Sequence, residues 1–111
     1  MIETILREYL EAGLKIPVRA EKPEAPPEKY VVVEKTGSGC ENYINSAIFA
    51  IQSYAPSMYE AMELNEQVKE IMSDFDELDC IYSAKLNTDY NFTDTAVKGY
   101  RYQAVFNIKH Y

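Results

Sequence analysis

The feature that most constrains the fold is a run of strand-forming residues between positions 42 and 54. Alternate residues form two sets, one made of Ile44, Ser46, Ile48, Ala50 and Tyr54, the other of Tyr43, Ala47, Phe49 and Ile51. Both sets are largely apolar, whereas a strand with one face in water alternates apolar and polar residues. The sequence therefore predicts a central strand whose sheet is covered on both faces.

Two segments have the periodicity of amphipathic helices. Residues 1–12 place Ile2, Ile5, Leu6, Tyr9 and Leu10 on one side, and Gly13 is expected to end this helix. The second helix opens at Pro56, and Ser57 and Glu60 fit a capping box in which each side chain satisfies a free amide. Its apolar stripe consists of Ala61, Leu64, Val68, Ile71 and Phe75. The stripe indicates that this helix packs on a sheet.

Four further segments are compatible with strands: residues 16–20, 30–36, 80–90 and 100–111. Three prolines make residues 21–28 an extended loop, which is expected to join two neighbouring strands. Gly37, Ser38 and Gly39 are expected to end the strand before them. The polar residues 89–99 are expected to join the last two strands as a hairpin. The sequence predicts one α+β domain over residues 1–111, in the order α-β-β-β-α-β-β.

Charge and composition limit the classes of partner. The net charge is −7, and the chain has ten tyrosines but no tryptophan. An acidic balance argues against direct binding to nucleic acid or an anionic membrane, since both need a basic face. Residues 1–10 carry charges in place of a signal peptide's apolar run, and Cys40 and Cys80 lack metal-like spacing. We expect a soluble protein of a reducing compartment, with both thiols buried and inert.

No constellation of residues requires catalysis or a cofactor. The Gly37–Cys40 segment lacks the lysine of a phosphate loop, and His110, the sole histidine, is the penultimate residue. The acidic residues between 74 and 79 lack the glycine and the spacing of a calcium loop, which favours a solvated helix end. We expect a protein that is not an enzyme and that binds no cofactor and no metal.

Several features together resemble one family. They are the opening helix, the short strand at 16–20, the Pro-rich loop running into the valines at 31–33, the long central strand, the acidic helix and the Tyr-rich terminal hairpin. This combination resembles the small tail-completion, or tail-terminator, proteins of long-tailed bacteriophages and prophages. The resemblance implies two helices packed with a mostly antiparallel sheet. It also implies a ring, typically of six subunits, that stops polymerisation of the tail tube and presents a docking surface to the head connector.

The implied partners are other copies of the chain, the tail tube protein and the head connector protein. The implied location is the bacterial cytoplasm during assembly and then the virion tail. Polar loops are the best candidates for the contacts, and exposed strand edges could extend pairing between subunits. Acidic side chains facing a lumen would let DNA pass without adhering. The candidate partner-binding residues are Glu21, Lys22, Glu24, Glu28 and Tyr30 in one loop and Asp89, Asn91, Thr93 and Asp94 in the other.

Three alternatives stay open at this point. A head-completion or neck protein shares the assembly logic but binds the portal side. A cytosolic adaptor would bind one host protein and have no phage role. An enzyme would need carboxylates such as Glu34, Glu41 or Asp79 to converge in a pocket.

Overall fold

The computed structural model describes residues 1–94, 96 and 99–111. Two helices and five strands follow the predicted order, with one short 3-10 turn added after the second helix. The elements are α1 (Ile2–Leu14), β1 (Val18–Arg19), β2 (Tyr30–Glu41), β3 (Ile44–Ala55), α2 (Met58–Met72), η1 (Phe75–Glu77), β4 (Ile81–Asn91) and β5 (Tyr100–His110). The predicted α+β class is confirmed.

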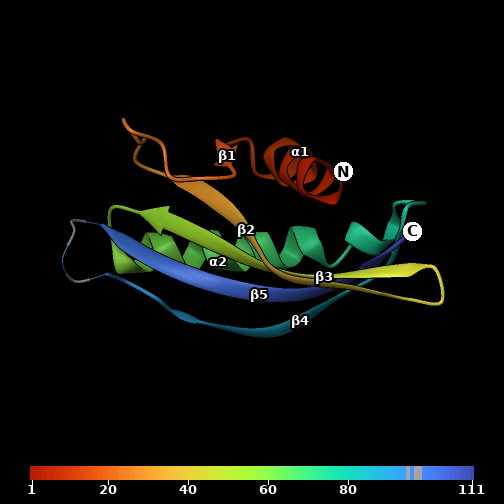
Figure 1. Cartoon of the computed structure of the whole chain (residues 1–111). Coiled ribbons are helices and arrows are strands. Elements are labelled where there is room, and N and C mark those ends of the chain that lie inside the picture. The colour runs from red at the N-terminus through yellow and green to blue at the C-terminus, as the bar shows by residue number, and fades with distance from the viewer. Residues whose placement is uncertain (95, 97–98) are drawn as a thin grey trace.

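The strands form one sheet in the order β1-β2-β3-β5-β4 (Figure 1). Only β1 runs parallel to its neighbour, β2, and the other three pairs are antiparallel. The Pro-rich segment therefore joins neighbouring strands, as predicted. Because these two strands are parallel, the segment returns the chain to the level at which β1 began before β2 starts. The mostly antiparallel sheet and the central place of β3 are both confirmed.

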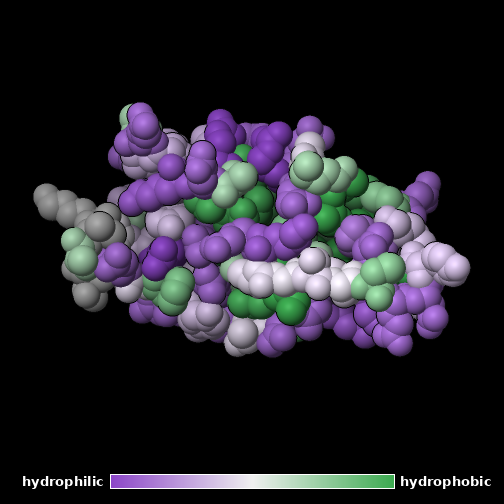
Figure 2. Space-filling view, viewed as in Figure 1, coloured by the Kyte–Doolittle hydropathy of each residue, from purple (hydrophilic) through white to green (hydrophobic). Residues whose placement is uncertain are grey.

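Both helices lie on one face of this sheet. Phe49 and Ile51 of β3 share a buried cluster with Leu6 of α1 and with Leu64 and Val68 of α2. On the opposite face the side chain of β3 at Ile48 is 41% exposed, so the prediction of two covered faces is wrong. Hydrophobic atoms reach the surface in Figure 2 mainly where α1 meets the sheet, and most of that view is hydrophilic.

Side chains of the uncovered face shield one another. The rings of Tyr30 and Tyr54 stack there with centroids 4.5 Å apart, and Tyr30, Ala50 and Gln52 are all buried. These residues are buried by neighbouring side chains of the sheet, so an apolar pattern on this face does not require a covering helix. The apolar pattern of residues 42–54 therefore misled the prediction.

The β2–β3 hairpin is longer than predicted. Gly37, Ser38 and Gly39 do not end β2, which continues to Glu41 with an irregularity between Lys35 and Gly37. The turn is made by Asn42 and Tyr43, whose φ angles of 51° and 66° fit a type I′ turn. The hairpin consequently projects past the helices at the end of the molecule opposite the β4–β5 connection (Figure 1).

The caps of the two helices differ in part from expectation. Ser57 caps α2 as predicted, since its Oγ accepts a hydrogen bond of 3.2 Å from the Glu60 amide. The Glu60 carboxylate, however, accepts a bond from the Ser57 hydroxyl instead of from an amide. Gly13 does not end α1, because the left-handed cap residue is Lys15, with φ 61°.

Gly13 instead allows α1 to approach α2 closely. A Cβ atom at Gly13 would lie 3.0 Å from Cδ1 of Ile71, which is closer than packed carbon atoms approach. Any side chain at this position must push the two helices apart or displace Ile71. The close contact between the two helices therefore requires glycine at position 13.

Replacing this glycine tests the helix contact. Gly13→Val is expected to lower the free energy of unfolding by about 1–3 kcal/mol, because the added atoms overpack the contact with Ile71. Urea denaturation followed by circular dichroism measures the change. Ala12→Val, at the exposed neighbouring position, adds a side chain of the same kind and is the control. Equal losses in the two variants would show that β-branching in the helix, and not the contact, is responsible.

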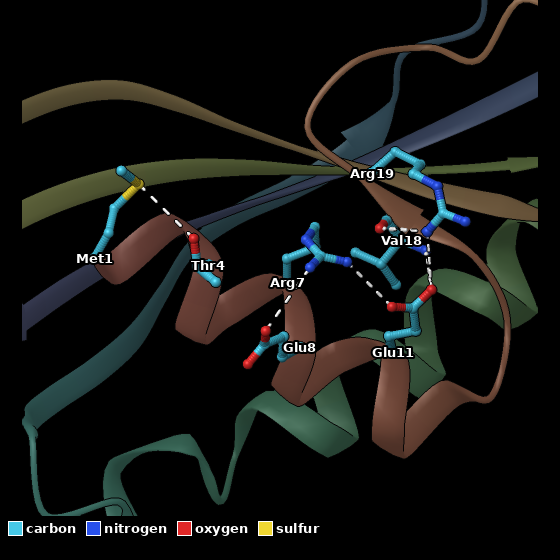
Figure 3. Close-up of polar contacts among 7 residues, drawn as sticks. All are labelled: Met1, Thr4, Arg7, Glu8, Glu11, Val18 and Arg19. Carbon is cyan, nitrogen blue, oxygen red and sulfur yellow. Dashed lines mark hydrogen bonds and ion pairs between the residues drawn. The ribbon is translucent and has the colours of Figure 1, made fainter.

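The carboxylate of Glu11 fastens β1 to α1 (Figure 3). Its Oε1 accepts bonds from Nη1 of Arg19 at 2.9 Å and from the Val18 amide at 3.4 Å. Its Oε2 accepts a bond of 3.2 Å from Nη1 of Arg7. The hydrogen bond from Arg19 is the main cause that lowers the pKa of the Glu11 carboxyl below its ordinary value. A two-residue strand is thus held by a charged side chain as well as by its pairing.

The lowered pKa gives a pH-dependent contribution to stability. Charged Glu11 stabilises the fold above its ordinary pKa, and this contribution disappears as the pH falls through the lower pKa of the folded state. Glu11→Gln should therefore cost roughly 0.5 kcal/mol at neutral pH, a small figure because the pair is screened by solvent. Urea unfolding at several pH values should show the gap to the wild type closing in acid. A gap that stays constant with pH would mean that packing, and not charge, is lost.

Candidate protein-binding site

Both loops predicted to bind partners reach one pocket of about 490 Å³. Its apolar wall consists of Pro26, Pro27, Pro56, Tyr30, Tyr54 and Tyr100. Charged side chains of both signs stand around this wall: Lys22, Glu28, Asp94 and Arg101. Aromatic residues and arginine are the side chains most enriched where proteins bind one another.

Strand register creates this convergence. Tyr30 at the start of β2 pairs with Tyr54 near the end of β3, and Tyr100 at the start of β5 pairs with Ala55. The Pro-rich loop enters the sheet at the first of these rows, and the β4–β5 connection returns at the second. Two loops that lie about seventy residues apart in the chain therefore border one pocket.

Cations and aromatic rings alternate from the pocket to Phe92, which lies outside its lining. The Arg101 guanidinium carbon lies 5.6 Å from the centre of the Tyr54 ring and 4.3 Å from that of Phe92, while Nζ of Lys22 lies 5.9 Å from the Tyr54 ring. Cation–π contacts of this length are attractive. Burial is the main cause that raises the pKa of the Tyr30 phenol, so that side chain stays neutral at physiological pH.

A chain of hydrogen bonds continues from the pocket across the uncovered sheet face. Nη1 of Arg101 donates to the Tyr54 hydroxyl at 3.0 Å, and that hydroxyl donates to Oε1 of Gln52 at 3.3 Å. Gln52 donates to Gln103 at 2.9 Å, and Gln103 donates to the Tyr90 hydroxyl at 2.6 Å. Buried amides that are satisfied in this way fix one arrangement of their side chains. The uncovered face is thereby held in a defined shape.

Four of the predicted partner-binding residues line the pocket, namely Lys22, Glu28, Tyr30 and Asp94. Glu21 and Glu24, with Lys22 again, border a more open depression on the outer side of the Pro-rich loop, beside Arg7 and Arg19. The first loop thus presents side chains to two adjoining hollows.

The other predicted residues have internal roles. Asp89 lies within β4, not in a loop, and accepts bonds from Nζ of Lys69 at 3.0 Å and from Nδ2 of Asn65 at 2.9 Å. Asn91 ends β4 and accepts bonds from the amide and hydroxyl of Thr93. Thr95, Val97 and Lys98, inside the predicted loop range, lie outside the described residues.

Sequence reasoning missed Tyr54, Tyr100 and Arg101, which also line the pocket. Tyr54 was assigned to one face of a strand, and that assignment is right. What the sequence lacked was the register that sets these residues beside Tyr30. An aromatic residue at the end of each of two predicted strands was the available signal.

The three carboxylates named above for an enzyme do not all lie on one element of the sheet. Glu34 and Glu41 lie on β2, and Asp79 lies next to β4 at the other edge of the sheet. Among residues 1–94, 96 and 99–111, no three His, Cys, Asp or Glu side chains are placed to hold a metal ion. Neither described helix is long and apolar enough to cross a bilayer. No family model and no curated protein matches the sequence.

The Tyr54 hydroxyl is expected to stabilise both the pocket and the uncovered face. Tyr54→Phe keeps the ring stacked on Tyr30 but removes the link between Arg101 and Gln52, which should cost about 1 kcal/mol of unfolding free energy. Thermal and urea unfolding measure the loss. Tyr59→Phe, which removes a hydroxyl from a side chain that is 73% exposed on α2, should change stability by much less. Equal stability of the two variants would remove any structural role from the hydrogen-bond chain.

Proposed function

We propose that this protein is a structural assembly protein of a phage or prophage tail. It forms a ring, typically of six copies, that caps the tail tube and joins it to the head connector. It assembles in the bacterial cytoplasm and stays in the virion tail. The observation that carries this proposal is a sheet with unpaired strand edges on both sides. The pocket at one end of the sheet supports it as a surface for a partner.

Unpaired edges support the ring. A ring of identical subunits needs two different, complementary patches on each subunit. β4 is an edge strand along its whole length, and β1 pairs with β2 only at Val31 and Val32. The chain thus presents two long strand edges on opposite sides of one sheet.

Chemistry at the pocket end supports the binding of a protein partner. An apolar wall of tyrosine and proline with a charged rim is the usual anatomy of a protein interface. The wall is set in place by strand register, so a partner would meet a surface that is already formed. We assign this end to the contact with the tail tube or the head connector.

The net charge of −7 is compatible with a subunit whose ring surrounds passing DNA. Like charges on protein and phosphate repel, and no counterions are released by contact. A negative ring would therefore let DNA slide through without binding it.

Binding to tail tubes tests the proposed role of the pocket. Lys22→Ala and Glu28→Ala remove charges from its rim and should each weaken capping of purified tail tubes roughly two- to fivefold, the effect expected when a solvent-exposed charge pair is lost. Sedimentation of the protein with tubes, at several concentrations, gives the affinity. Glu63→Ala removes an equally exposed charge from α2 and is the control.

Native mass and tube binding together separate the alternatives. A closed oligomer that sediments with tubes supports the tail role. Binding to portal or connector protein but not to tubes would assign the protein to the neck. A monomer that binds neither would refute the phage assignment and favour an adaptor.

A further inference from the structure

We infer that neighbouring copies join by pairing residues 33–41 of β2 in one copy with β4 of the next. The sheet would then continue from subunit to subunit around the assembly. This inference rests on the proposed ring and names its interface.

Both edges have the length and the access that pairing requires. β1 covers only Val31 and Val32, so the outer side of residues 33–41 has no strand partner in the described part of the chain. Nine extended residues span about 30 Å. β4 has eleven residues, and among the residues that the structure describes it pairs on one side only, with β5. Unpaired backbone groups along such edges are templates for another strand.

Strand directions favour head-to-tail addition. From β2 through β3 and β5 to β4, each strand runs opposite to the one before it. A second copy in the same orientation therefore places its β2 antiparallel to β4 of the first, and the alternation continues. A two-fold pairing of β4 with β4 would also be antiparallel, but it would leave both β2 edges unpaired and could not close a larger ring.

Charges along the two edges match when the copies lie at the same level. Lys85 pairs with Asn107, Asn107 with Ile48, and Ile48 with Gly37. Lys85 and Gly37 therefore lie in one row that crosses the sheet. Glu34 lies three residues before Gly37 on β2. Because the bulge adds one residue, Glu34 pairs with Ala50, two residues from Ile48, and so lies on the same uncovered face. Across the joint, Lys85 of one copy and Glu34 of the next thus become diagonal neighbours, within reach of long side chains. Among the described residues neither has an ion-pair partner within its own chain.

One irregularity on each edge also falls at nearly the same level. β4 is bulged between Ile81 and Ser83 and again between Leu86 and Thr88, and β2 is bulged between Lys35 and Gly37. Only the second bulge of β4 lies near the level of the β2 bulge. Counted through the paired residues of β3 and β5, the Lys35–Gly37 bulge and the Leu86–Thr88 bulge lie at adjacent positions along the strands. Bulges deter pairing with a regular strand, whereas two matched bulges let the edges follow the same twist.

The cysteines lie where the joint can be probed. Both are exposed, so the prediction of buried thiols is wrong; Cys40 lies on the projecting hairpin and Cys80 in the turn before β4. Cys40 shares a row with Ile81, the residue after Cys80. Two strands separate the thiols within one chain, too far for a disulfide. Across the joint they become neighbours.

Covalent capture tests the pairing directly. A short bismaleimide added to the wild-type protein, alone and on tail tubes, should give a ladder of covalent oligomers that ends at the native ring. Cys40→Ser and Cys80→Ser should each abolish the ladder, because every link needs one thiol of each kind. Dimers that persist in Cys40→Ser would instead indicate β4 paired with β4 and would overturn the inference.

Charge exchange provides a second, independent test. Lys85→Glu and Glu34→Lys should each raise the concentration at which the oligomer dissociates, roughly tenfold, and the double variant should restore assembly. Glu63→Lys on α2 is the matched control. A discrete oligomer that gives no cross-link overturns this interface and leaves the proposed function standing. A protein that neither cross-links nor caps tubes refutes both.

Discussion

Burial of one face of β3 beneath two helices is the interaction on which the rest of the structure depends. Phe49 and Ile51 are fully buried there, and each contributes roughly 2–3 kcal/mol by leaving water. The same cluster includes residues of α1, α2, β2 and β5. Because both helices are used on this face, the other face must be stabilised by its own side chains. Stacked tyrosines and paired glutamines provide that stabilisation.

This division of the sheet determines which surfaces of the chain stay accessible. The helices cover the middle of the sheet, so what they leave accessible is the uncovered face, the projecting hairpin, two strand edges and the end where the loops meet. Register, and not loop sequence, brings Tyr30, Tyr54 and Tyr100 together at that end. The pocket and the free edges are consequences of the same strand order.

Sequence patterns predicted what depends on local periodicity. The predicted stripe of α2 is confirmed at Ala61, Leu64 and Val68, which are buried, while its last member, Phe75, lies beyond the helix in η1 and is buried as well. Gly37 and Gly39 were misread because glycine favours a bulged strand as well as a turn, and the residues that turn, Asn42 and Tyr43, were placed in a strand. The exposure of Cys40 depends on how far the hairpin extends past the helices, which no local pattern records. The two loops that border the pocket were predicted. The strand residues that line it, Tyr54, Tyr100 and Arg101, could be found only from the strand register.

Unpaired edges are ordinarily a hazard, since any exposed strand can add to them. Two features of this chain oppose such addition. The net charge of −7 repels copies at random orientations, and bulges on β2 and β4 disfavour regular strands. In the head-to-tail pairing inferred above, Lys85 would lie near Glu34, and one bulge of each edge would lie at a similar level. Overall repulsion with local attraction is the physical condition for subunits that stay separate until they meet in one geometry.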